Sequence, residues 1–96
     1  MNFLAGDLGG TKTLLAIFRF EEGAKKIYQK YYLSANWSSF SAILSDFIKY
    51  LPLNIEKPTY GCIAVAGPVI KGASLITNLS WEIEESEICL VAGLKK

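Results

Sequence analysis

A stripe of apolar residues at helical spacing constrains the fold more than any other feature of the sequence. Apolar side chains recur at intervals of three and four residues along positions 40–51: Phe40, Ile43, Leu44, Phe47, Ile48 and Leu51. This spacing predicts an amphipathic helix that packs one face against a sheet. Asn36 or Ser38 can cap its start, and Pro52 ends it because the residue before a proline is pushed out of helical geometry.

Short apolar runs on both sides of this helix predict the strands of that sheet. Residues 3–5, 13–20 and 27–33 form three runs separated by tight turns, which predicts a three-strand antiparallel meander. Residues 62–66, after the helix, are apolar without alternation and predict a buried strand parallel to its neighbour. Strand, helix and strand form a crossover unit, so the expected fold class is α/β.

The last third of the chain predicts smaller elements. Glycine and proline in residues 67–72 indicate a short hairpin whose second arm is residues 74–77. Residues 82–87 are polar, with acidic side chains that suit a helix start, and residues 88–94 are apolar, so a helix is expected there. No repeat or linker divides the sequence, and residues 1–96 are expected to form a single domain.

The composition argues against several classes of protein. Ten basic and nine acidic residues give a net charge of +1 without a basic block, so nucleic acid is not an expected partner. The apolar runs are far shorter than the roughly 20 residues that cross a bilayer, and the start has no basic region of a signal peptide. We therefore expect no membrane partner and a cytoplasmic location. Cys62 and Cys89 match no metal spacing and are expected to be two buried thiols.

A glycine turn between the first two predicted strands carries the candidate chemistry. Its sequence is Asp7-Leu8-Gly9-Gly10-Thr11-Lys12-Thr13. Gly9 and Gly10 lack the Cβ atoms that would keep backbone N–H groups from approaching phosphate oxygens. Thr11 adds a hydroxyl donor and Lys12 a compact positive charge, while Asp7 can hold Mg²⁺ directly or through water. The turn therefore predicts a nucleoside triphosphate site.

Two familiar phosphate-binding loops do not fit this turn. The Walker loop needs glycine where Thr11 stands and a helix afterwards, whereas a strand is predicted here. The dinucleotide pattern G-x-G-x-x-G is missing from the sequence. A hairpin turn with a purely structural role is the remaining alternative, and the flanking Asp7, Thr11 and Lys12 favour phosphate binding over it.

Two segments of the sequence resemble the bacterial glucokinase family, within the superfamily of hexokinase, actin and heat-shock ATPases. Residues 4–16 resemble its first phosphate motif, and residues 61–69 with 77–81 are similar to its strand, Gly-Pro turn and Thr-Asn-x-x-Trp segment. The resemblance covers residues 3 to about 83. It implies a ribonuclease-H-like (actin-like ATPase) half in which helices pack on the sheet. It also implies ATP and Mg²⁺ as cofactors and glucose as the phosphoryl acceptor.

The resemblance also implies which functional parts lie outside this sequence. The family's catalytic aspartate belongs to an Asn-Asp pair that would follow residue 96, so no catalytic residue is expected here. Residues 1–96 would be an N-terminal small domain without its C-terminal domain. Asn78 is the candidate residue on the sugar side, and Trp81 a loop anchor. The other functional-looking side chains are expected to be ordinary: Asp46 solvated on the helix, and Tyr28, Tyr31 and Tyr32 packing residues.

Three functions remain open at this point. The first is ATP-dependent phosphorylation of glucose to glucose 6-phosphate by a fragment that needs a complementing C-terminal half. The second is a non-catalytic nucleotide-binding or interaction module, and the third is a truncated gene remnant. An apolar cleft face that has lost its partner half would also promote self-association.

Overall fold

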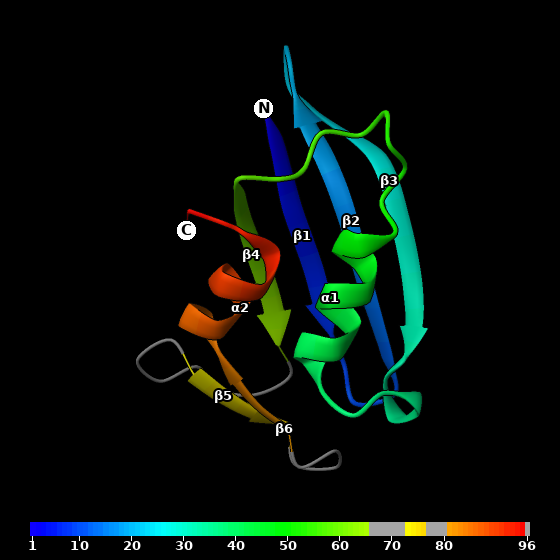
Figure 1. Cartoon of the computed structure of the whole chain (residues 1–96), viewed down its shortest axis with the longest axis vertical. Coiled ribbons are helices and arrows are strands. Elements are labelled where there is room, and N and C mark those ends of the chain that lie inside the picture. Colours follow the sequence, from blue (N-terminus) through cyan, green and yellow to red (C-terminus); the bar gives the residue numbers. More distant parts are fainter. Residues whose placement is uncertain (66–72, 77–80, 96) are drawn as a thin grey trace.

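The main sheet combines the predicted meander with one parallel strand. The computed structural model describes residues 1–65, 73–76 and 81–95. Its four-stranded sheet has the order β3-β2-β1-β4 (Figure 1), with β1 at Asn2–Leu8, β2 at Lys12–Phe20, β3 at Ala24–Leu33 and β4 at Tyr60–Val65. β1 and β2 are antiparallel, as are β2 and β3, and β4 runs parallel to β1. The strand topology predicted from the sequence is confirmed.

Helix α1 (Phe40–Lys49) makes the crossover from β3 to β4 and lies across one face of the sheet (Figure 1). The N–H group of Ala42 donates to Ser39 Oγ at 3.1 Å, so Ser39 caps the helix. The predicted caps were wrong, because Asn36 belongs to the short 3-10 helix η1 (Ser34–Asn36) and Ser38 precedes the cap. Leu51 lies beyond the end of α1 but still packs into the core.

The core lies between α1 and the strands that it covers. Leu4 stands opposite Ile17 across the β1–β2 pair, and residues at every second position therefore share this face. The side chains that meet in the core are almost fully buried: Leu4, Leu8, Leu15 and Ile17 from β1 and β2, and Phe40, Ile43, Leu44 and Phe47 from α1. The predicted helical stripe is thus the part of α1 that packs on the sheet.

The C-terminal part adds a small hairpin and a second helix. β5 (Ala73–Ile76) pairs antiparallel with β6 (Trp81–Glu84), and α2 (Glu85–Ala92) follows. The second arm of the predicted hairpin, residues 74–77, corresponds to β5 at residues 73–76, which pairs with the strand that follows it. Residues 67–72 of that hairpin lie outside the described residues. The expected terminal helix is confirmed from Glu85 onward, with Glu85 and Glu87 in its first turn, whereas residues 82–84, also expected in the helix, belong to β6.

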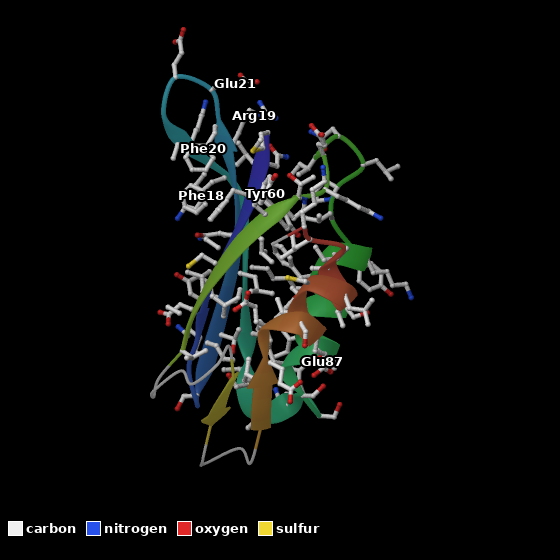
Figure 2. All side chains as sticks on the ribbon, turned by 90° about the vertical axis from the view of Figure 1, so that its left-hand side faces the viewer. Phe18, Arg19, Phe20, Glu21, Tyr60 and Glu87 are labelled. Carbon is white, nitrogen blue, oxygen red and sulfur yellow. The ribbon has the colours of Figure 1, made fainter. Side chains whose placement is uncertain are left out.

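Both helices cover the same face of the sheet (Figure 2). They are joined by a hydrogen bond in which Ser41 Oγ donates to Glu87 Oε1 at 2.7 Å. At the other end of α2, the Lys95 N–H group donates to the Thr59 carbonyl oxygen at 2.7 Å, just before β4. Among the described residues, neither helix has the length and apolar character needed to span a membrane.

The opposite face of the sheet is covered by no helix of the described part of the chain. Phe18 and Phe20 lie on this side in Figure 2, and the rings of Phe20 and Phe3 meet edge to face with centroids 5.7 Å apart. β4 is an edge strand whose residues alternate between half-buried and exposed, so the prediction of a fully buried strand was wrong. Cys62 is exposed on this face and Cys89 is half-buried, so the expected pair of buried thiols is also wrong.

A hydrogen bond from a buried tyrosine connects β3 to α1. Tyr32 Oη donates to Asp46 Oδ2 at 2.8 Å, and Lys30 Nζ lies 3.3 Å from the same oxygen. The Asp46 side chain is only 19% exposed, so it is not the freely solvated group that the sequence predicted. Burial raises the pKa of Tyr32 above its ordinary value, and the hydrogen bond to Asp46 and the negative charge of Asp46 act in the same direction.

The other two tyrosines of β3 differ from Tyr32 and from each other. Tyr28 is half-buried, and its ring packs against Phe47 with the centroids 5.6 Å apart. Tyr31 is 54% exposed, because its place in the strand directs it to the face without helices. Tyr28 and Tyr32 therefore pack as expected, whereas Tyr31 lies at the surface.

The raised pKa of Tyr32 predicts a loss of stability at alkaline pH. Above about pH 10, the ordinary tyrosine pKa, the unfolded chain releases this proton while the folded chain retains it, so the free energy of unfolding falls as pH rises. One proton contributes at most about 1.4 kcal/mol per pH unit. Urea unfolding between about pH 9 and 11.5 should show a shallower decline for Tyr32→Phe than for the wild type. Equal slopes would contradict the assignment, and Asp46→Asn should lie between the two.

Candidate functional site

The predicted phosphate turn lies between the end of β1 and the start of β2 (Figure 1). The Gly9 N–H group donates to the Lys12 carbonyl oxygen at 3.2 Å, which leaves Gly10 and Thr11 as a two-residue turn. A Cβ atom on Gly9 would lie 2.8 Å from that same carbonyl oxygen, so any larger residue would have to displace backbone. This close approach explains why the residue at position 9 is a glycine.

The strand topology places Asp7 beside this turn. β1 and β4 are parallel and end together, with Leu8 in register with Val65. The carboxyl ends of parallel strands form the edge at which open α/β sheets bind ligands. Asp7 is exposed one residue before the end of β1, in register with Leu14 on one side and Ala64 on the other. Its carboxylate therefore belongs to the face without helices, at the edge that carries the turn.

Lys12 shares that face with Asp7. Asp7 and Leu14 are opposite each other in the β1–β2 pair, and Lys12 is two residues from Leu14 on the same strand. The Lys12 Nζ atom lies 4.8 Å from the centroid of the Tyr31 ring, and Thr11 is exposed in the turn between them. The structure thus brings together the predicted phosphate-site residues, with one acidic and one basic side chain flanking the turn.

Asp7 is suited to a magnesium ion that is held largely by other ligands. The described residues contain no group of three side chains that could together bind a metal ion. Mg²⁺ nevertheless often binds through one or two carboxylates, with water and phosphate oxygens completing its shell. A single exposed carboxylate beside the predicted phosphate turn fits that mode.

Ser34 holds the turn from the helix-covered side, a role that no pattern in the sequence indicated. Ser34 is fully buried. Its Oγ atom donates to the Gly9 carbonyl oxygen at 2.8 Å, and its N–H group donates to the Thr11 carbonyl oxygen at 3.0 Å. Ser34 follows Gly9 by 25 positions, and only the pairing of β2 with β3 brings them together. A serine after an apolar run has no local pattern that would signal such contacts.

The remaining N–H groups of the turn are available to a ligand. Within the described part of the chain, no acceptor is bonded to the N–H groups of Gly10 and Thr11. Consecutive backbone N–H groups in a turn form the kind of concavity that binds anions. The arrangement can therefore bind a phosphate group through backbone donors, the Thr11 hydroxyl and the Lys12 ammonium.

The structure describes only part of the second predicted motif. Residues 61–65 lie in β4, and Trp81 starts β6. Asn78, the candidate residue on the sugar side, lies outside the described residues, as does the Gly-Pro turn at residues 67–68. The described geometry therefore concerns the predicted phosphate turn and not the predicted sugar side.

Comparison with known proteins gives consistent matches along the whole chain. A family model described as Glucokinase matches residues 4–96. A glucokinase of Nostoc punctiforme is 36% identical over 93 residues, which is 95% of this chain and 27% of the relative. A glucokinase of Synechocystis is 32% identical over 92 residues, covering 86% of this chain and 26% of the relative.

A solved structure shares the fold as well. The crystal structure of a glucokinase from an Antarctic psychrotroph superimposes with a TM-score of 0.82 at 28% identity, over 97% of this chain and 30% of that one. The chain therefore spans somewhat more than a quarter of the length of these relatives. The superposition confirms the predicted fold class, a half of the actin-like ATPase type with helices packed on a mixed sheet.

The close approach at Gly9 gives a stability prediction. Gly9→Ala should lower the free energy of unfolding by about 1–3 kcal/mol, because the added methyl group displaces the Lys12 carbonyl and breaks the bond that closes the turn. The matched control is Thr11→Ala in the same turn. Its side chain is exposed, so we expect a change within about 0.5 kcal/mol. Urea unfolding followed by circular dichroism measures both, and equal stability of the two variants would refute the steric argument.

Proposed function

The chain belongs to the glucokinase family, and we propose that it is the N-terminal, nucleotide-phosphate-binding domain of an ATP-dependent glucose kinase. The proposed reaction transfers the γ-phosphoryl group of ATP to the 6-hydroxyl group of glucose, giving glucose 6-phosphate. The observation that supports a phosphate-binding role is the turn itself, in which Gly10 and Thr11 carry backbone donors without acceptors in the described part of the chain. Family membership then supports ATP as the source of that phosphate.

Each residue of the turn has a proposed role in holding the nucleotide. Gly9 and Gly10 allow close approach, and the N–H groups of Gly10 and Thr11 donate to phosphate oxygens together with the Thr11 hydroxyl. Asp7 holds Mg²⁺, directly or through water. When bound, Mg²⁺ neutralises negative charge on the phosphate groups during transfer.

In this proposal, the Lys12 ammonium leaves the Tyr31 ring and binds a phosphate group of the nucleotide. Its ammonium lies over the Tyr31 ring, which is 54% exposed. A cation–π contact at an exposed position contributes only about 0.5–1 kcal/mol. A triphosphate offers a stronger, charge-assisted partner, and the flexible lysine stem allows the ammonium to move to it.

The general base of the proposed reaction lies in the part of the relatives that this chain does not match. A base must reach the sugar hydroxyl within hydrogen-bond distance. Asp7 is assigned to the metal, and Asp46 is already bonded to Tyr32 and Lys30 away from the turn. The match covers 27% of the Nostoc punctiforme relative. We therefore assign the base, the sugar-selecting residues and the adenosine site to a complementing C-terminal half, with Asn78 contributing on the sugar side.

The alternatives are a non-catalytic nucleotide-binding or interaction module and a truncated gene remnant. The uncovered sheet face, with Phe3, Phe18 and Phe20, favours an interaction role among these. A location in the cytoplasm, where ATP and glucose are available to the enzyme, is part of the main proposal.

A coupled assay for ADP tests the kinase proposal directly. The purified chain is incubated with ATP, Mg²⁺ and glucose, alone and together with the C-terminal half of a related glucokinase. We expect turnover only in the mixture, because only the mixture supplies both walls of the site. Asp7→Ala should lower that turnover at least about tenfold if it removes the metal ligand.

The control for Asp7→Ala is Glu21→Ala, which removes an exposed carboxylate at the far turn between β2 and β3 and should leave the rate unchanged (Figure 2). Silence in both reactions would favour a binding module or a gene remnant. Turnover by the chain alone would show that the base lies within it, against the proposal.

The exposed apolar face predicts that the isolated chain self-associates. Phe20 is 49% exposed on the uncovered face, and apolar patches of this kind are rarely left open in monomers. Light scattering should show a mean mass that rises with concentration, and Phe20→Lys should weaken the rise. Leu53→Lys is the control, since Leu53 is fully exposed in the loop between α1 and β4 and away from the sheet face. A monodisperse monomer at all concentrations would contradict the prediction.

A further inference from the structure

Ser34 makes three hydrogen bonds around the phosphate turn, and their direction can be assigned. The Ser34 hydroxyl donates to the Gly9 carbonyl, which accepts but cannot donate. A hydroxyl has a single proton, so in the contact of 2.8 Å between Thr13 Oγ1 and Ser34 Oγ the donor is Thr13. Two consecutive buried hydrogen bonds therefore connect Thr13, through the Ser34 hydroxyl, to the backbone of the turn.

The bond to the Gly9 carbonyl fixes the orientation of a whole peptide unit. A trans peptide is planar, with its carbonyl and N–H groups pointing in opposite directions. The described residues contain no cis peptide bond. Since the Gly9 carbonyl points at the buried Ser34 hydroxyl, the N–H group of Gly10 in the same peptide unit points away from Ser34 and out of the core.

A second bond from the same residue restrains the other side of the turn. The Ser34 N–H group donates to the Thr11 carbonyl oxygen at 3.0 Å. Gly10 and Thr11 are thus enclosed between two peptide carbonyls that are both bonded to Ser34. Glycine at position 10 would otherwise leave this turn free to sample many backbone conformations.

We propose that Ser34 is a positioning residue for nucleotide binding: it holds the Gly9–Gly10 peptide so that the Gly10 N–H group is directed at the phosphate before the nucleotide arrives. Its hydroxyl does not touch the ligand, because it is buried beneath the turn and its proton is already donated. Pre-orienting a donor improves binding by removing the ordering cost that the ligand would otherwise meet. The identity of the ligand rests on the proposed function, whereas the orientation of the turn does not.

The first measurement is the backbone rigidity of the turn, and it requires no ligand. Amide ¹⁵N relaxation is recorded for Gly10 and Thr11 in the 96-residue chain, below the concentrations at which light scattering detects association. In the wild type the order parameters should be near the rigid-backbone value of about 0.85, and in Ser34→Ala they should fall below about 0.6. Ser34→Cys retains the size and a weaker donor, so it should give an intermediate value and remain folded if Ser34→Ala does not.

The second measurement is the Kd of the same chain for Mg-ATP by titration. Ser34→Ala should raise the Kd about three- to tenfold, the range that one net hydrogen bond represents. Tyr32→Phe is the matched control, since it also removes a buried hydroxyl, but one whose acceptor is Asp46 and not the turn. It should lower stability while leaving both the Kd and the order parameters of the turn at the wild-type values. In the complemented assay, Ser34→Ala should raise the KM for ATP without changing the KM for glucose.

The outcomes separate this inference from the proposed function. A turn that stays rigid in Ser34→Ala overturns the positioning role, whatever the chain binds. An unchanged Kd in Ser34→Ala, beside a wild type that binds Mg-ATP, overturns it as well. A wild type that binds no Mg-ATP either alone or together with the complementing C-terminal half, with a turn that loosens on mutation, rejects the nucleotide proposal and leaves the turn restraint standing.

Discussion

The contact between α1 and the central strands is the constraint on which the rest of the structure depends. Four side chains of α1 are buried in the core with four from β1 and β2, and each contributes roughly 1.5–3 kcal/mol when fully buried. Beside β4 this layer is closely packed: a Cβ atom at Gly6 would lie 2.7 Å from Ile63 Cδ1, so a larger residue would require the Ile63 side chain to move. Because this packing fixes β1, it also fixes where β1 ends and therefore where the glycine turn stands.

The same short segment connects the core to the turn. Between the end of β3 and the start of α1, Ser34 bonds to the turn and Ser39 caps the helix. Residues 34–39 thus both begin the helix that makes the core and hold the backbone of the glycine turn.

The sequence predicts those parts of the structure that are determined locally. The stripe from Phe40 to Ile48 identified α1, and the glycines at 9 and 10 located the turn between two strands. What it could not predict depends on contacts between distant segments. The bonds of Ser34 to Gly9 and of Tyr32 to Asp46 exist only after β3 is in place. β4 is apolar on both faces, and no local pattern shows that one face, with Cys62, would be left uncovered.

The exposure of the turn is consistent with the proposal that the site is completed by further protein. Asp7, Thr11 and Lys12 all face solvent, where the attraction between charges is weakened by the high dielectric constant of water. The same groups would act more strongly on a triphosphate once a second wall excluded water from it. Backbone donors held by Ser34 suit such a site, because they need no reorganisation as the cleft closes. The geometry of the turn is therefore built into this chain, whereas the strength of its interactions would come from the wall that it faces.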